Sequence, residues 1–169
     1  MSGWPGIDAR GARIAGAALG GESLAAAALA LAVPMIERWE GTRLLPYRDI
    51  VGIWTVCAGE TRVAMRRYTR AECAALLHAT VVNDYGAAVL RAVPALETRP
   101  HQLAASISLS YNIGTAAFAR STVARRFNAG DWRGGCEAFL MWNKAGGKVV
   151  QGLANRRADE RRLCLTGLP

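Results

Sequence analysis

The chain has 169 residues and a mass of 18.0 kDa, the size of one compact domain with a buried core. Its 21 Lys and Arg exceed its 13 Asp and Glu, giving a net charge of +8 that suits nucleic acid, an anionic membrane surface or an acidic polymer. No helix-turn-helix pattern, aromatic RNA-binding motif or Cys/His zinc spacing accompanies this charge, which argues against nucleic acid and against a metal site.

Residues 14–36 form an apolar stretch in which Glu22 is the one charged residue. As a helix the stretch would span about 35 Å, enough to cross a bilayer core. However, it consists mainly of Ala and Gly, and its centre reads Gly-Gly-Glu-Ser. A central acidic residue costs about 2.5–3.5 kcal/mol of insertion free energy, whereas each Leu returns only about 0.3–0.6 kcal/mol. The stretch is therefore marginal as a membrane anchor.

Two arginines, Arg10 and Arg13, precede this stretch. By the positive-inside rule they keep the N-terminus in the cytoplasm and direct the rest of the chain outward. We therefore divide the chain into an N-terminal segment, 1–36, and a folded domain, 37–169. Two other readings stay open, namely an Ala-rich helix of a soluble protein and a cleaved signal peptide.

The next predicted element is a helix that ends at Gly41. Pro34 predicts the start of this helix, because proline is tolerated in the first turn, and glycine is typical just past a helix end. Glu40 then lies in the last turn, where the negative end of the helix dipole disfavours a carboxylate. This position suits an acid that ionises reluctantly.

A β-hairpin is predicted next, with its turn at residues 50–52. Asp49 and Thr55 are equally far from Gly52, so they should be cross-strand partners on one face. A carboxyl at a helix end would then face a carboxylate and a hydroxyl, and glycoside hydrolysis needs one protonated acid and one ionised acid. Taken singly, each residue is better explained as a surface acid or a strand-forming threonine.

The remainder of the chain is predicted to be helical. Thr69 and Glu72 form a capping box that opens a helix ending before Pro94. His78 and His101 are expected to be structural groups. Three further helices are expected, one from Leu103 to Tyr111, one capped by Asp131 and ending near Met141, and one from Leu153 to Leu165.

Glu40, Asp49 and Thr55 are separated by eight and five residues, and this order resembles the catalytic motif of the phage-type lysozymes, glycoside hydrolase family 24. Asn-x-Gly-Thr at 112–115 and Trp-x-x-Ala-Gly-Gly-Lys at 142–148 resemble further motifs of that family. The family more often has Gly-His-Thr where this chain has Gly-Glu-Thr at 59–61, so no histidine role is carried over.

The resemblance implies an α+β, mostly helical lysozyme-like fold, with a small lobe that bears a short β-hairpin sheet, a larger helical lobe and a cleft between them. It implies hydrolysis, with inversion and no cofactor, of the β-1,4 bond between N-acetylmuramic acid and N-acetylglucosamine in peptidoglycan. Glu40 would be the general acid, and Asp49 and Thr55 would activate water. Candidates for substrate contact are Tyr111, Asn112 and Ser121, for which core packing and helix capping are the alternatives.

The N-terminal segment resembles the signal-anchor-release segments of a subset of phage endolysins. The host secretion machinery exports such segments, which tether the enzyme to the inner membrane and later release it into the periplasm. Two rival functions remain. A lytic transglycosylase would also use one Glu acid but would not need Asp49 or Thr55, and a membrane-tethered wall-binding protein would need no catalysis.

Four cysteines permit disulfides only in an oxidising compartment such as the periplasm. Cys57 and Cys73 both belong near the hairpin, and Cys136 and Cys164 both belong to the C-terminal helices. Pairing within each region is favoured, and buried free thiols are the alternative.

Overall fold

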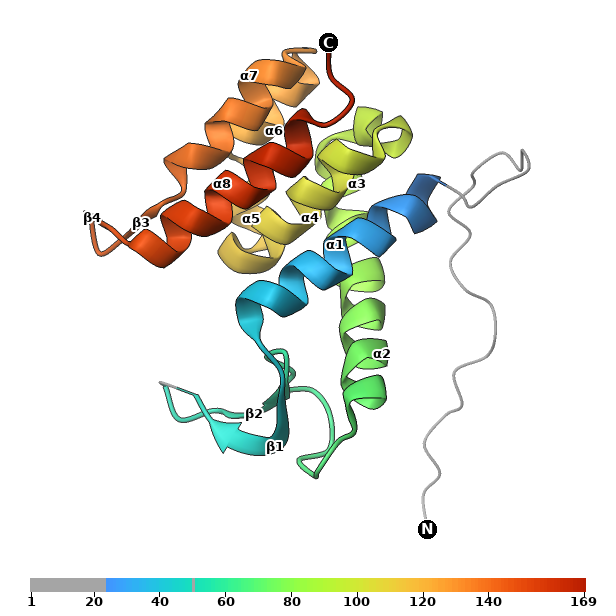
Figure 1. Ribbon diagram of the computed structural model, residues 1–169, viewed down its shortest axis with the longest axis vertical. Helices are drawn as coiled ribbons and strands as arrows, with labels where there is room; N and C mark the ends of the chain where they lie inside the picture. The colour runs from blue at the N-terminus through green and yellow to red at the C-terminus, as the bar shows by residue number, and fades with distance from the viewer. Residues whose placement is uncertain (1–23, 50) are drawn as a thin grey trace.

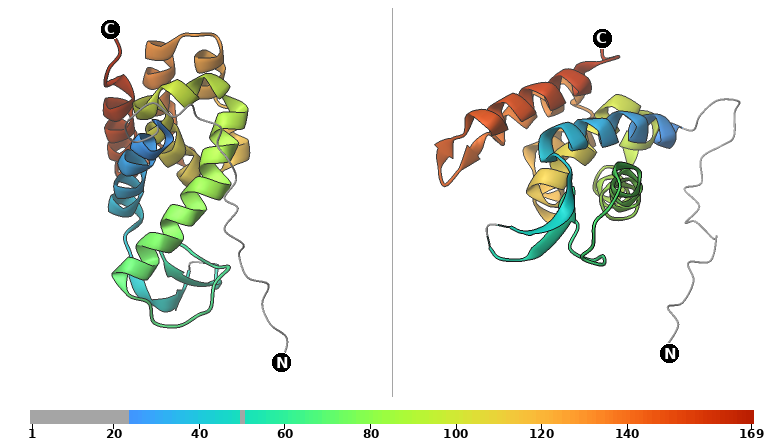
Figure 2. Two further views of the ribbon diagram at one scale, coloured as in Figure 1. Left: turned by 90° about the vertical axis from the view of Figure 1, so that its right-hand side faces the viewer. Right: turned by 60° about the horizontal axis from the view of Figure 1, so that its bottom comes forward.

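The computed structural model describes residues 24–49 and 51–169, which form a larger helical lobe and a small lobe built on a β-hairpin (Figure 1). One long helical stretch joins the two lobes (Figure 2). The elements are α1 (Leu24–Glu40), β1 (Arg43–Arg48), β2 (Trp54–Cys57), α2 (Arg70–Thr80), a π-helical turn (Val81–Gly86), α3 (Ala87–Ala92), a 3-10 helix (Pro94–Thr98), α4 (Pro100–Ile113), α5 (Thr115–Ala119), α6 (Thr122–Asn128), α7 (Trp132–Glu137), a 3-10 helix (Ala138–Met141), β3 (Lys144–Ala145), β4 (Lys148–Val149) and α8 (Gln151–Leu165). This is the mostly helical α+β fold that the sequence predicted.

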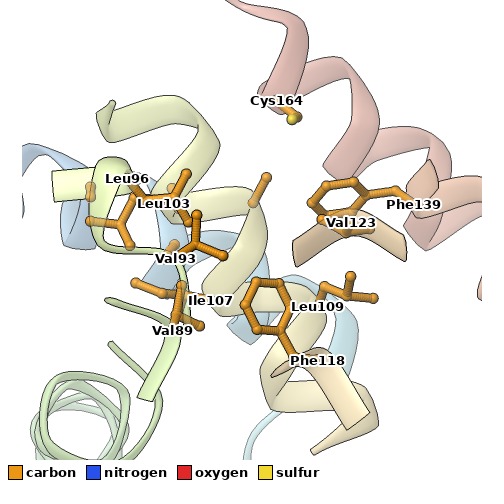
Figure 3. Close-up of a cluster of buried hydrophobic side chains, with 14 of the residues drawn as sticks. Val89, Val93, Leu96, Leu103, Ile107, Leu109, Phe118, Val123, Phe139 and Cys164 are labelled. Atoms are coloured by element: carbon orange, nitrogen blue, oxygen red, sulfur yellow. The ribbon is translucent and has the colours of Figure 1, made fainter. Parts of the chain in front are cut away.

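The larger lobe is packed around α4, in which every residue from 102 to 110 is buried. Such burial requires a helix that is apolar or small on all sides, and α4 carries Ala, Ser, Leu and Ile without Asp, Glu, Lys or Arg. Helices α1 and α8 pack along it. Figure 3 shows Leu103, Ile107 and Leu109 of α4 in one buried cluster with Val89, Phe118 and Phe139 from other elements. This core supports the helices on which the candidate site is built.

Helix α1 corrects one prediction, because Pro34 lies inside the helix and does not start it. An internal proline removes the hydrogen bond to the carbonyl of residue 30. Ala30 is exposed, so water can satisfy that carbonyl. Ala28, Ala32 and Ile36 are fully buried, and their packing offsets the cost of Pro34. The helix continues without a break across residues 36 and 37, between which the domain boundary was predicted from the sequence. Residues 14–23 of the predicted membrane segment lie outside the described residues.

The helical stretch between the lobes begins and ends as the sequence predicted. The Thr69 hydroxyl accepts a hydrogen bond from the Glu72 backbone N–H, and the Glu72 carboxylate accepts one from the Thr69 N–H at 2.7 Å. Helical structure continues to Ala92, shortly before Pro94. The Arg66 guanidinium and the Thr69 N–H lower the pKa of the Glu72 carboxyl to about 2, so this cap is charged at neutral pH.

The register of the β1–β2 hairpin differs from the prediction by two residues, because the centre of the turn lies at Val51 and not at Gly52. Thr55 pairs with Tyr47, not with Asp49, and the Asp49 N–H donates to the Ile53 carbonyl at 2.9 Å. The turn is displaced because the Asp49 carboxylate itself accepts backbone N–H groups of the loop. Side chains alternate along a strand, so Asp49 and Thr55 still share a face as diagonal neighbours. Gly52 takes the left-handed conformation in the turn, with φ of +83°.

Each lobe is crosslinked by one disulfide. Cys57 and Cys73 join β2 to α2 in the small lobe, and Cys136 and Cys164 join α7 to α8 in the larger lobe. Both pairs lie within a region, the arrangement favoured from sequence. The small lobe depends strongly on its bridge, because among its described residues the buried apolar cluster contains only Val56, Tyr68 and the two cysteines, with partly buried neighbours around them.

We expect protein recovered from the periplasm and unfolded without reductant to show no free thiols. The crosslinks close loops of 16 and 28 residues, and each should stabilise the fold by about 3 kcal/mol relative to the reduced chain. Titration with a thiol reagent checks this, and a reduced sample provides the four-thiol reference. Four thiols in the unreduced protein would contradict the prediction.

Candidate active site

Glu40 is the last residue of α1, and Gly41 follows it in the left-handed conformation, with φ of +70°. Only glycine adopts this conformation without strain, so Gly41 fixes where the helix stops. The Glu40 side chain is 28% exposed, and its Oε1 accepts a hydrogen bond from Nη1 of Arg156 at 2.6 Å. Among the described residues no donor contacts Oε2. One oxygen is thus held while the other is available.

Arg156 lies in α8, is almost fully buried and belongs to a charged network inside the larger lobe. Its Nε donates to Glu160 Oε1 at 3.2 Å, and Arg157 pairs with Glu160 Oε2 at 2.8 Å. The Ser108 hydroxyl also donates to Glu160, at 2.7 Å. Burial raises the pKa of the Glu160 carboxyl, and the two guanidiniums act against this increase. The network holds Arg156 in place against Glu40.

Arg156 is a site residue that was not predicted from the sequence. Its spacing from Glu160 indicates an i, i+4 ion pair on the last helix. No local signal shows that this pair faces Glu40, which lies 116 residues earlier in the chain. The negative end of the helix dipole repels the Glu40 carboxylate, whereas the Arg156 guanidinium attracts it.

Asp49 stands at the end of β1, and one of its oxygens holds the hairpin loop together. Oδ1 accepts hydrogen bonds from the backbone N–H groups of Val51 at 2.9 Å and Ile53 at 2.8 Å. The carboxylate is thereby fixed in orientation, and among the described residues no donor contacts Oδ2. Within the described residues, Asp49 thus keeps its second oxygen free as an acceptor while its first oxygen fixes its orientation.

Thr55 lies on β2 and is buried, with 3% of its surface exposed. Its hydroxyl donates to the Ile53 carbonyl at 3.1 Å. A hydroxyl that donates its proton in this way still has oxygen lone pairs that can accept from a water molecule. Thr55 and Asp49 therefore offer two acceptors from the same hairpin.

Two contacts connect the small lobe to the rest of the molecule near the site. The buried Glu60, for which no histidine role was carried over, accepts a hydrogen bond from the Thr80 hydroxyl at 2.6 Å. The Tyr111 hydroxyl donates to the Ala58 carbonyl at 2.6 Å. Burial, followed by the charge of Glu40, raises the pKa of Tyr111, which therefore stays neutral and keeps this contact at physiological pH.

Each of the three substrate-contact candidates makes a hydrogen bond within the protein. Besides Tyr111, the Asn112 side chain accepts from Arg157 at 3.1 Å, and the Ser121 hydroxyl caps α6 by accepting from the Ala124 N–H. Their contact with substrate stays a prediction. Within residues 24–49 and 51–169, no three His, Cys, Asp or Glu side chains gather in a way that could hold a metal ion.

The chain is similar to known proteins both in sequence and in structure. A family model described as phage lysozyme matches residues 37–160. The SAR-endolysin of Enterobacteria phage P21 is 40% identical over 158 residues, which cover 89% of this chain and 93% of that protein. The endolysin from Escherichia coli O157:H7 phage FAHEc1 is 31% identical, with a TM-score of 0.71 over 88% of this chain and 97% of that one. A mutant of P22 lysozyme is 30% identical, with a TM-score of 0.70 over 80% and 95% of the two chains.

Proposed function

Since the chain belongs to the phage lysozyme family, we propose that it is a phage endolysin that hydrolyses the β-1,4 bond between N-acetylmuramic acid and N-acetylglucosamine. Cleavage of that bond in peptidoglycan would lyse the host cell. One observation supports this proposal above all. Glu40, with Oε1 held by Arg156 and Oε2 available, is separated by two residues from the hairpin that carries Asp49 and Thr55.

The proposed reaction begins with proton donation from Glu40 Oε2 to the glycosidic oxygen as the bond breaks. Asp49 Oδ2 and the Thr55 oxygen hold a water molecule and orient it for attack on the opposite face of the sugar ring. Asp49 accepts the proton of that water, and the product anomer is inverted. Inversion requires about 6.5–9.5 Å between the two carboxyl groups, so that the water fits between them.

The products distinguish this reaction from that of a lytic transglycosylase. Such an enzyme leaves anhydro-muramic ends, because the sugar's own hydroxyl takes the place of water. The oriented Asp49 and the Thr55 hydroxyl favour water as the nucleophile. We expect mass spectrometry of a peptidoglycan digest to show reducing ends gaining one water per cleavage. Anhydro ends would favour the transglycosylase, and an unchanged digest would favour the non-enzymatic wall-binding protein.

We also propose that residues 14–36 first hold the enzyme on the inner membrane after export and then release it. The buried Ala28, Ala32 and Ile36 support this idea, since the second half of the segment fills part of the core of the larger lobe. The same side chains cannot face lipid and this core together, so the tethered chain must lack this packing. Arg70–Ala92 also has the length and composition of a membrane span, but here it joins the two lobes.

Replacing Gly20, Gly21 and Glu22 with leucine should convert the segment into a permanent anchor. The change removes the central acid, which costs about 2.5–3.5 kcal/mol in lipid, and adds apolar side chains. We expect the variant to remain in the membrane fraction, while the wild type appears partly as full-length soluble periplasmic protein. Immunoblotting of the two fractions measures the effect. A soluble wild-type form that begins near Pro34 would instead indicate a cleaved signal peptide.

A further inference from the structure

The tip of the β1–β2 hairpin exposes apolar side chains that a soluble protein ordinarily buries. Val51 is 72% exposed and Ile53 is 51% exposed, and Leu45 and Trp54 are also exposed. Arg48 lies over the Trp54 ring, with its guanidinium carbon 4.8 Å from the ring centroid. Isolated exposed apolar residues need no explanation, whereas a group of them at one loop indicates a contact surface.

The β3–β4 hairpin has the same character. Met141, just before it, is 63% exposed, and Val149 is 59% exposed. The two lysines of the whole chain, Lys144 and Lys148, both lie on this short hairpin, while the other cationic side chains at neutral pH are arginines. Both lysines are exposed, and within the described part of the chain neither has an acidic partner.

The two hairpins arise on either side of the candidate active site. β1 follows Glu40 after two residues, and β4 is separated by one residue from α8, which carries Arg156. The Glu40–Arg156 contact therefore lies between the bases of the two hairpins. Figures 1 and 2 show both hairpins projecting from the same side of the molecule. A single broad surface can thus touch both tips.

We propose that these two tips, residues 51–54 and 144–149, dock on an anionic phospholipid surface. Aliphatic side chains gain free energy in the acyl boundary but offer little to a sugar. Trp54 suits the headgroup level, where an aromatic ring meets water, and the unpaired lysines attract anionic headgroups. The net charge of +8 complements the same surface.

Docking in this orientation would place the membrane against both hairpins, which arise on either side of the Glu40–Arg156 contact. A glycan strand then cannot reach the site, so enzyme on the membrane is silent and enzyme in the periplasm is active. This consequence rests on the proposed function. The lipid contact itself does not, since it is a property of the exposed side chains.

The test is co-sedimentation of the full-length chain with vesicles of phosphatidylglycerol and phosphatidylethanolamine in equal parts. Lys144→Gln with Lys148→Gln should weaken binding by about 20- to 30-fold, since each cation contributes about fivefold at an anionic surface. Val51→Ser with Ile53→Ser should weaken it by about tenfold or more. The control is Arg91→Gln with Arg125→Gln, which removes the same charge elsewhere and should have a much smaller effect. All variants share the N-terminal segment, so its own affinity cancels.

Binding of both hairpin variants that equals that of the control would overturn the proposal. Self-association of the wild type that the hairpin variants lose, with unchanged vesicle binding, would also overturn it and assign the tips to a second copy of the chain. For the occlusion step, vesicles should slow hydrolysis of soluble peptidoglycan fragments more for the wild type than for the hairpin variants, each relative to its own rate without vesicles. Vesicle binding by Glu40→Gln keeps the lipid contact testable even if the proposed function fails.

Discussion

Replacing Glu40 with glutamine should lower the rate of peptidoglycan hydrolysis by about 10²–10⁴-fold, the range that general acid catalysis contributes. Glutamine keeps the shape of the side chain and an oxygen that can accept from Arg156, but it has no proton to transfer. The fold should therefore survive, and the thermal midpoint should change little. Turbidity loss of outer-membrane-permeabilised cells gives the rate, and circular dichroism gives the midpoint.

Glu37→Gln is the matched control, because Glu37 lies one turn earlier on α1 and its side chain has no partner among the described residues. This variant loses the same charge and should keep its activity. Wild-type turnover in Glu40→Gln with unchanged melting would remove Glu40 from the role. Equal losses in both variants would point to the charge of the helix and not to the acid.

Local sequence signals predicted those parts of the fold that depend on neighbouring residues. Thr69 and Glu72 specify the start of α2 by themselves, and Gly41 specifies the end of α1, because each acts through backbone groups a few residues away. The place of Pro34 inside α1, and not in its first turn, could not be predicted in this way. Its cost is offset by packing of α1 on α4, far along the chain, and a local rule does not include that contribution.

The hairpin shows a similar limit. Symmetry about Gly52 predicted Asp49 opposite Thr55, because it took no account of hydrogen bonds between side chains and the loop backbone. In the structure the Asp49 carboxylate closes the loop on the Val51 and Ile53 N–H groups and displaces the pairing. The shared face was nevertheless predicted, because the alternation of side chains along a strand does not depend on that detail.

Only part of the candidate site could be predicted from the sequence. The spacing of Glu40, Asp49 and Thr55 pointed to the chemistry, since all three lie in one stretch of chain. The support for Glu40 comes from Arg156, and Arg156 is in turn held by Glu160. Contacts between the two ends of the chain arise only once α1 and α8 pack along α4.

Loss of Glu160, which holds Arg156, should have the largest effect on the stability of the protein. Glu160 is fully buried beside Arg157, which is also fully buried, and Arg156 is nearly so. Glu160→Ala would leave two guanidiniums in the core without their carboxylate, and breaking a buried ion pair in this way costs roughly 3–5 kcal/mol of unfolding free energy. Urea unfolding should show a much lower midpoint with an unchanged slope.

Two further variants separate charge from packing in this network. Glu160→Gln keeps the side-chain volume and an acceptor for Ser108 but removes the charge, so it should lose most of the same free energy if the guanidiniums are dry. Glu137→Ala breaks the more exposed pair between Glu137 and Arg161, which water screens, and its loss should be much smaller. A Glu160→Ala loss no larger than that of Glu137→Ala would mean that water reaches Arg157 in the folded protein. In that case Arg156 would not be rigidly held, and the fixed orientation of Glu40 would need another cause.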